Sequence, residues 1–231
     1  MKKIGILGLG PHSSIEYYKK LIEMSQKKWD HKNPDIIIYN KDDGEWAELI
    51  EYKKDYKKAK EFLFEAIKAL TSAGSDFIIM ASNTPHLFYD ELQERITIPM
   101  LSISDSIAKE AEISGYENVG LIGTKMTMNS NFYYDSFEDT DINLKVPDDE
   151  KQDMIHEKIV EELVKGIMKD ETKAKLSEAC KQFIKMENLD SLILGCTELP
   201  LILSEEKLGV PFLDTIEIHT KYAFQYCLSD E

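Results

Sequence analysis

The feature that most constrains the fold is a set of short apolar segments, each of which ends in glycine or in a polar turn. IGILG at residues 4–8 and VGLIG at residues 119–123 have the same form. FIIMA at residues 77–81 runs into SNTP, and LILG at residues 192–195 runs into CTELP. Short apolar runs bounded by turn residues are typical of buried strands. The sequence therefore predicts two pairs of buried strands in the same order along the chain.

The spacing of these segments indicates two copies of one motif. In the first copy the turn residue Ser82 follows Gly5. In the second copy Cys196 follows Gly120 at the same spacing to within one residue. An apolar step through proline, IPML or VPFL, then follows each turn at a similar distance. The repeat predicts that Ser82 and Cys196 occupy equivalent positions.

Amphipathic stretches at residues 51–73 and 154–186 carry apolar residues at helical spacing between these strands. Alternation of strand and helix predicts an α/β protein with two pseudo-symmetric, doubly wound parallel-sheet halves. We expect residues 1–99 plus 211–231 to form the first half and residues 100–210 the second. Open parallel sheets bind ligands at the carboxyl ends of their strands, so we expect the active site in the cleft between the halves.

Charge and composition exclude several classes of function. The formal charge of −15, from 28 basic and 43 acidic residues, opposes binding to nucleic acid or to an anionic membrane. No apolar run approaches the roughly 18 residues of a membrane span, and the opening MKKIGILGLG enters a strand pattern, which predicts a cytoplasmic protein. The three cysteines have neither disulfide-framework nor metal-ligand spacing, so no metal is expected.

Cys196 is the candidate acid/base residue. It follows a buried strand at the start of a turn, where backbone N–H groups are expected to lower the pKa of a thiol below its usual value of about 8.5. An arbitrary cysteine is more often a small core residue, and we assign that role to Cys180. Cys196 differs from Cys180 and Cys227 because the repeat makes it equivalent to Ser82.

Polar residues at the other predicted strand ends are candidates for binding a small substrate. Hydroxyl, amide and carboxylate groups there are able to hold an ammonium or a carboxylate group, although such residues are as often capping residues. The glycine turns before predicted helices also resemble anion-receiving turns. A dinucleotide fingerprint is incomplete, because Ser13 stands where the third glycine belongs. The candidates are Gly10, Ser13, Ser14, Asn83, Thr84, Thr124, Thr197 and Glu198.

Three histidines, His12, His86 and His219, lie beside predicted strand ends. Histidines in such places serve as acids or as orienting groups, and most isolated histidines are structural. We therefore assign them no chemical step.

The segments IGILG, MASNTPHLFYDELQ, VGLIGTKMT and LILGCTELPLIL resemble those of the aspartate/glutamate racemase family, over nearly the whole chain. The resemblance implies a cofactor-independent isomerase, a racemase or epimerase of aspartate or glutamate, with two pseudo-symmetric halves. Members use two opposed cysteines to remove and return the substrate α-proton, which here implies Cys196 as one acid/base residue. The resemblance also implies a small acidic amino acid as the substrate and a homodimer.

The sequence departs from the family pattern at two places. Ser82 stands where most members carry the second cysteine, and DDGEW at residues 42–46 stands where many carry an arginine. A hydroxyl ionises far less readily than a thiol, so Ser82 needs help from water or a base to exchange a proton.

Three readings stay open. The chain is a racemase that works mainly through Cys196, with Ser82 or water relaying the second proton, or its site was altered to trap substrate, or it catalyses a different reaction. The third reading includes a single-cysteine decarboxylase or isomerase of the same superfamily. A catalytically impaired amino-acid-binding protein is the alternative outside enzymes.

Overall fold

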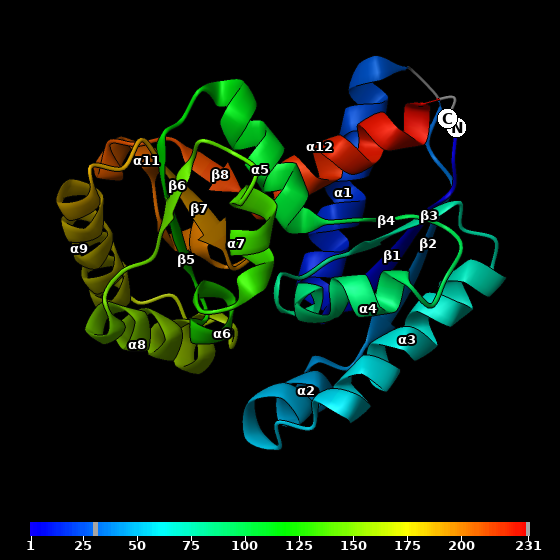
Figure 1. Cartoon of the computed structure of the whole chain (residues 1–231), viewed down its shortest axis with the longest axis horizontal. Helices are drawn as coiled ribbons and strands as arrows, with labels where there is room; N and C mark the ends of the chain where they lie inside the picture. The colour runs from blue at the N-terminus through cyan, green and yellow to red at the C-terminus, as the bar shows by residue number, and fades with distance from the viewer. Residues whose placement is uncertain (30–31, 230–231) are drawn as a thin grey trace. The chain divides into compact units, whose positions relative to one another are not determined.

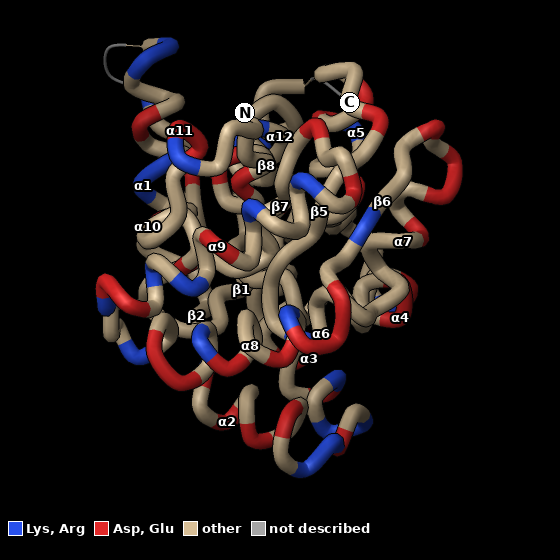
Figure 2. Tube along the Cα trace, turned by 90° about the vertical axis from the view of Figure 1, so that its left-hand side faces the viewer, with Lys and Arg blue, Asp and Glu red and all other residues tan. Residues whose placement is uncertain are grey.

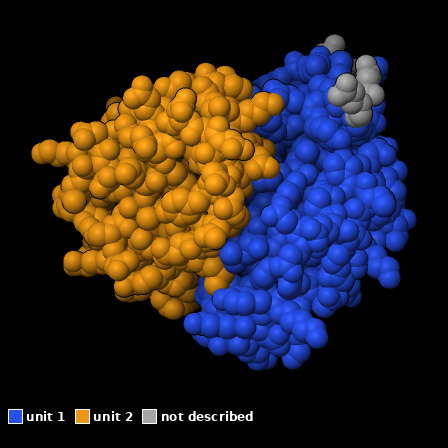
Figure 3. All heavy atoms as spheres, in the orientation of Figure 1, with its two compact units in different colours: residues 1–103, 219–231 blue, residues 104–218 orange. Residues whose placement is uncertain are grey.

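The computed structural model describes residues 1–29 and 32–229. It divides into two compact units (Figure 3). The first comprises Met1–Ile103 and His219–Glu231, and the second comprises Ser104–Ile218. Each unit contains one four-stranded sheet in which all neighbouring strands are parallel. The predicted α/β class with two parallel-sheet halves is confirmed.

The sheet of the first unit has the order β2-β1-β3-β4. Residues Ile4 and Leu7 of β1 pair with Phe77 and Met80 of β3, so the two inner strands end at the same edge. In chain order (Figure 1) the elements are β1 (Ile4–Leu9), α1 (Pro11–Lys28), β2 (Ile36–Lys41), α2 (Asp43–Ala47), the π-helical turn η1 (Glu48–Tyr52), α3 (Tyr56–Ser72), β3 (Phe77–Met80), the 3-10 turn η2 (Thr84–Phe88), α4 (Tyr89–Gln93) and β4 (Met100–Leu101).

The sheet of the second unit has the matching order β6-β5-β7-β8. The final helix, α12, runs through the boundary at His219, so its later residues belong to the first unit. The elements are α5 (Ile103–Ser114), β5 (Asn118–Gly123), α6 (Lys125–Met128), α7 (Asn131–Phe137), β6 (Asn143–Lys145), α8 (Asp149–Lys158), the π-helical turn η3 (Ile159–Leu163), α9 (Asp170–Glu187), β7 (Ser191–Gly195), α10 (Leu199–Ile202), α11 (Glu205–Leu208), β8 (Phe212–Asp214) and α12 (Thr215–Leu228).

The predicted boundaries of the halves differ from those of the structure. Residues 100–101 were placed in the second half, but β4 pairs with β3 in the first sheet. Residues 212–214 were placed in the first half, but β8 pairs with β7 in the second sheet. In each unit the strand that follows the proline pairs with the sheet formed by the strands before it in the chain. Each boundary therefore falls one strand later than expected.

The inner strands form the centre of each core. β1, β3, β5 and β7 carry no Asp, Glu, Lys or Arg, and Figure 2 shows the charged positions gathered on helices and loops. In the second unit the apolar face of α9, including Leu176, Cys180 and Phe183, packs into the same cluster as Leu192 and Leu194 of β7. Burial of such faces is the main term that stabilises the fold. Among the described residues no helix is long and apolar enough to cross a membrane.

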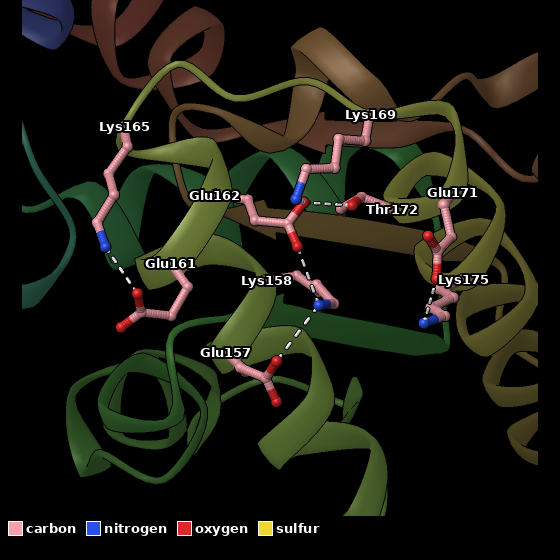
Figure 4. Close-up of polar contacts among 9 residues, drawn as sticks. All are labelled: Glu157, Lys158, Glu161, Glu162, Lys165, Lys169, Glu171, Thr172 and Lys175. Carbon is pink, nitrogen blue, oxygen red and sulfur yellow. Dashed lines mark hydrogen bonds and ion pairs between the residues drawn. The ribbon is translucent and has the colours of Figure 1, made fainter.

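The stretch at 154–186 is not one continuous helix. It breaks between η3 and α9, where Gly166 adopts a φ of +73°, a conformation that favours glycine. Figure 4 shows Glu162 bridging the break. Its carboxylate accepts hydrogen bonds from Thr172 Oγ1 at 2.5 Å and Lys158 Nζ at 3.0 Å, and lies 3.5 Å from Lys169 Nζ. These donors lower the pKa of Glu162 to about 2, with the Thr172 hydroxyl the largest cause.

Candidate active site at the ends of the inner strands

Cys196 lies directly after β7, and the strand positions the thiol. All residues of β7 are buried, whereas Cys196 is partly exposed, so the chain leaves the core at this residue. Its Sγ donates a hydrogen bond to Glu198 Oε2 at 2.9 Å. The hydroxyl of Thr197 donates to the same oxygen, also at 2.9 Å. The structure thus brings Cys196, Thr197 and Glu198 together through one carboxylate oxygen.

The electrostatics of Cys196 differ from the expectation. Burial of the sulfur, and then the negative charge and hydrogen bond of Glu198, raise the pKa of the thiol well above its usual value. The backbone amides of Glu198 and Thr197 lower that pKa, as expected, but their effect is smaller. The resting group is therefore a neutral thiol whose proton points at a carboxylate, and Glu198 is placed to accept that proton.

Thr124 leaves the sheet beside Cys196, because Gly123 of β5 pairs with Gly195 of β7. Its side chain does not point to a free anion site. Thr124 Oγ1 accepts the N–H of Thr127 at 3.2 Å and caps α6. The N–H of Lys125 is taken by His156 Nδ1 at 3.3 Å. This turn was expected to receive an anion, but the N–H groups of Lys125 and Thr127 donate to side chains within the fold.

Ser82 begins the equivalent turn of the first unit. It is partly exposed, and its Oγ makes no hydrogen bond with the residues that the structure describes. Asn83 is buried at 4% exposure, and its carbonyl oxygen accepts the N–H of His86 at 3.0 Å. Thr84 is partly buried and begins η2. The hydroxyl of Ser82 thus has no base beside it of the kind that Glu198 supplies to Cys196.

The glycine turn after β1 reaches the same edge as Ser82. Gly10 adopts a φ of +85°, which a residue with a side chain rarely does. Ser13 and Ser14 are buried, and both hydroxyls donate within the fold: Ser13 to Leu9 O at 3.4 Å, and Ser14 to Gly10 O at 3.0 Å. Ser14 also donates to Asn40 Oδ1 at 2.7 Å. The hydroxyls of both serines thus contact the turn that precedes α1, and their binding of substrate stays a prediction.

Two histidines have structural roles that the sequence only hinted at by their places near strand ends. His86 contacts the Ser82 turn, and His219 Nε2 donates to Leu101 O at 3.0 Å while its Nδ1 accepts from Tyr17 OH at 2.9 Å. Burial lowers the pKa of His86 to about 4 and that of His219 to about 3. Both rings are neutral at physiological pH. His12 is exposed.

The other cysteines belong to the core. Cys180 is 1% exposed, and burial raises its pKa to about 12. Cys227 Sγ donates to Lys2 O at 3.0 Å. Among residues 1–29 and 32–229, no group of three or more His, Cys, Asp or Glu side chains is arranged to hold a metal ion.

Known proteins resemble this chain in sequence and in fold. RacX, a broad-specificity amino-acid racemase of Bacillus subtilis (strain 168), is 28% identical over 224 residues, which cover 92% of each chain. The crystal structure of an aspartate racemase homologue from Pyrococcus horikoshii OT3 has a TM-score of 0.84 and 36% identity, and the match covers 99% of this chain and 100% of that chain. Picrophilus torridus aspartate racemase has a TM-score of 0.77 and 29% identity, covering 98% and 94%. The family model for Asp/Glu/Hydantoin racemase matches residues 6–223. This chain therefore belongs to the Asp/Glu/hydantoin racemase family.

Proposed function

We propose that this protein is a cofactor-independent racemase or epimerase of a small acidic amino acid, aspartate or glutamate, with Cys196 as its acid/base residue. The observation that carries the proposal is the hydrogen bond from Cys196 Sγ to Glu198 Oε2, at a strand end where parallel sheets bind ligands. Family membership supports racemase activity, and the names of the relatives point to aspartate and to a broad range of amino acids.

The proposed reaction begins with transfer of the thiol proton to Glu198. The Cys196 thiolate then takes the α-proton, and the electron pair of the broken C–H bond is left on the α-carbon beside its carboxylate. A proton arrives on the opposite face from Ser82, which regains one from water, or from water directly, and Glu198 gives its proton to the hydroxide that this water leaves. General acid–base catalysis of this kind supplies about 10²–10⁴-fold in rate. In this scheme Glu198 moves a proton, and is not only a substrate ligand.

The remaining polar residues divide into two roles in this proposal. Asn83, Thr84 and Thr197 hold the substrate, together with backbone groups of the Gly10 turn. Ser13, Ser14 and Thr124 shape the turns that present those groups, since their hydroxyls already have partners within the fold.

We further propose a cytoplasmic homodimer. The free state of Cys180, Cys196 and Cys227 supports a reducing compartment, and likeness to the family supports the dimer. Sedimentation velocity of the reduced protein tests the assembly, and a single monomeric species contradicts it.

The test of the function is proton NMR of L- and D-aspartate and of L- and D-glutamate in D2O, following α-deuteration together with chirality. Exchange by the wild type and by Cys180→Ala, a control that removes a buried thiol, but not by Cys196→Ala is the expected result. Exchange that survives in Cys196→Ala, or its absence from the wild type with all four amino acids, would falsify the proposal.

A second function has one observation in its favour. A neutral thiol whose equivalent position in the repeat carries the serine Ser82 is suited to donating a single proton, as a decarboxylase or isomerase of the same superfamily requires. Loss of CO₂ from a substituted malonate leaves a carbanion that Cys196 would protonate. Turnover of malonate-type acids without α-exchange of amino acids favours this reaction, and binding of aspartate with neither activity favours an impaired binding protein.

A further inference from the structure

The turn that carries Ser82 is held from beneath by a buried imidazole ring. His86 is 2% exposed, and its Nδ1 lies 2.9 Å from Ser82 O and 3.2 Å from Asn83 O. Its Nε2 lies 3.1 Å from the backbone N of Ile103, at the start of α5. One side chain therefore connects the turn after β3 to the segment after β4.

The hydrogen-bond pattern fixes which nitrogen carries the proton. The N–H of Ile103 can only donate, so Nε2 of His86 is an acceptor and carries no proton. Nδ1 of the neutral ring must then be the donor, and the two carbonyl oxygens beside it accept. Because the ring has one donor and one acceptor in fixed places, it holds the Ser82 carbonyl in one orientation.

Neighbouring rings hold the imidazole in place. His86 stacks on Tyr89 with centroids 6.0 Å apart and planes at 9°, and Tyr89 OH donates to Met100 O at 2.7 Å. His219 packs edge-on with centroids 5.9 Å apart. These ring contacts come from α4 and from α12 within the first unit, so a shift of the imidazole ring would disturb both helices.

Among the described residues of the second unit, no imidazole ring forms a hydrogen bond with the main chain at Cys196. Pro200 stands four residues after Cys196, where His86 stands four residues after Ser82. The corresponding tie is made by Thr215 Oγ1, which donates to Leu194 O at 3.0 Å. Leu194 O belongs to β7, before the turn, so the hydrogen bond from Thr215 does not hold the main chain at Cys196. Of the two turns, only the Ser82 turn is held by a histidine among the described residues.

We propose that His86 is a positioning residue, which fixes the main chain at Ser82 so that its hydroxyl is held in place to return the second proton. This rests on the proposed function, because it gives His86 a part in return of the second proton. A displacement of about 1 Å at a reacting group costs up to roughly 10²-fold in rate. Loss of the clamp therefore slows inversion more than it slows exchange at the Cys196 face.

Two substitutions separate the donor and the acceptor of the ring. His86→Asn keeps an N–H near the place of Nδ1, and so keeps the bond to Ser82 O. His86→Gln keeps an oxygen near the place of Nε2, and so keeps the bond from Ile103 N while losing the clamp. His156→Gln is the matched control, since His156 also accepts a backbone N–H, from Lys125 in the second unit.

The first readout is amide hydrogen exchange of the peptide covering 82–88, measured by mass spectrometry on the folded proteins. The second is the ratio of inversion to α-deuteration with the substrate that the wild type turns over. We expect His86→Gln to lower both the protection of the turn and the ratio by about tenfold. His86→Asn and His156→Gln should keep both near the wild-type values.

Unchanged protection in His86→Gln overturns the proposal, and so does an equal loss of inversion and deuteration in both His86 variants, because that reports only general destabilisation. A wild type without any exchange refutes the proposed function instead. In that case the protection measurement still decides whether His86 holds the turn.

Discussion

The turns after β3 and β7 have the same place in matching sheets but different chemistry. After β7, the reactive atom Cys196 Sγ has a carboxylate at 2.9 Å. After β3, Ser82 offers a hydroxyl without such a partner among the described residues, and the buried ring of His86 beneath it contacts the main-chain oxygens of Ser82 and Asn83. The two strand ends thus match in position, whereas the side chains two residues after Cys196 and four residues after Ser82 give the two turns different hydrogen bonds.

The largest expected effect comes from removing the proton acceptor of the second turn. Glu198→Gln keeps the size of the side chain but leaves a group that cannot take the thiol proton, so α-deuteration should fall by about 10²–10⁴-fold. Deuteration rates by NMR check this, with Glu205→Gln as the control, since the carboxylate of Glu205 accepts a backbone N–H, that of Phe212. A change of less than about threefold in Glu198→Gln would mean that water accepts the proton.

A smaller change is expected when the first turn is made to resemble the second. Ser82→Cys replaces a hydroxyl with a thiol, whose reference pKa of about 8.5 is much closer to neutrality. We expect inversion to rise by roughly tenfold while deuteration at the Cys196 face changes little. Chiral chromatography of the product measures inversion. If Ser82→Cys inverts no faster than the wild type, the second proton does not come through this position.

The neutral histidines of the first unit predict a pH dependence of stability. The unfolded pKa is 6.5, and the folded values are about 4 for His86 and about 3 for His219. Below pH 6.5 the unfolded chain therefore binds protons that the folded chain does not. The free energy of unfolding should be highest above pH 6.5 and should fall toward pH 4, by up to about 1.4 kcal/mol per pH unit for each histidine.

Urea unfolding at a series of pH values checks this. The double variant His86→Gln with His219→Gln should be less stable at pH 7 and show a flatter slope between pH 6.5 and 4. The same slope as in the wild type would assign the acid sensitivity to other groups.

The smallest effect is expected in the second unit, at the break before α9. Thr172→Val removes the hydroxyl that contributes most to lowering the pKa of Glu162, so that pKa should rise from about 2 toward 4.5. The folded carboxylate then contributes less stability above pH 4.5. Carbon-13 NMR titration of Glu162 measures the change, and Lys165→Ala, which removes only an exposed pair with Glu161, should leave it unaltered.

Much of the fold was predictable because it depends on local pattern. Apolar runs such as FIIM and LILG are buried strands, and their repeat gave the two matching sheets. The boundaries were not predictable, because the pairing of β4 with β3 and of β8 with β7 is decided by tertiary contacts. A proline before each strand marks the strand but not its sheet.

The candidate site was likewise predictable where it depends on local pattern and not where it depends on tertiary contacts. The place of Cys196 followed from the repeat, but its raised pKa depends first on burial of the sulfur and then on the rotamer of Glu198, neither of which a sequence pattern specifies. Ser14 looked like a substrate ligand because it follows a glycine turn. The structure shows in addition that a Cβ at Gly8 would overlap Ser14 Oγ, a close packing that the sequence pattern did not reveal.

The most direct test of the contrast between the turns is the pH dependence of alkylation at Cys196 by iodoacetamide, resolved from Cys180 and Cys227 by mass spectrometry. The account predicts that the wild-type thiol titrates above the usual range for cysteine and is un-ionised at neutral pH. Glu198→Gln should move that titration downward, because it removes the negative charge beside the sulfur. A wild-type thiolate already formed at pH 7, or a titration that Glu198→Gln does not move, would contradict the claim that Glu198 holds the proton of Cys196.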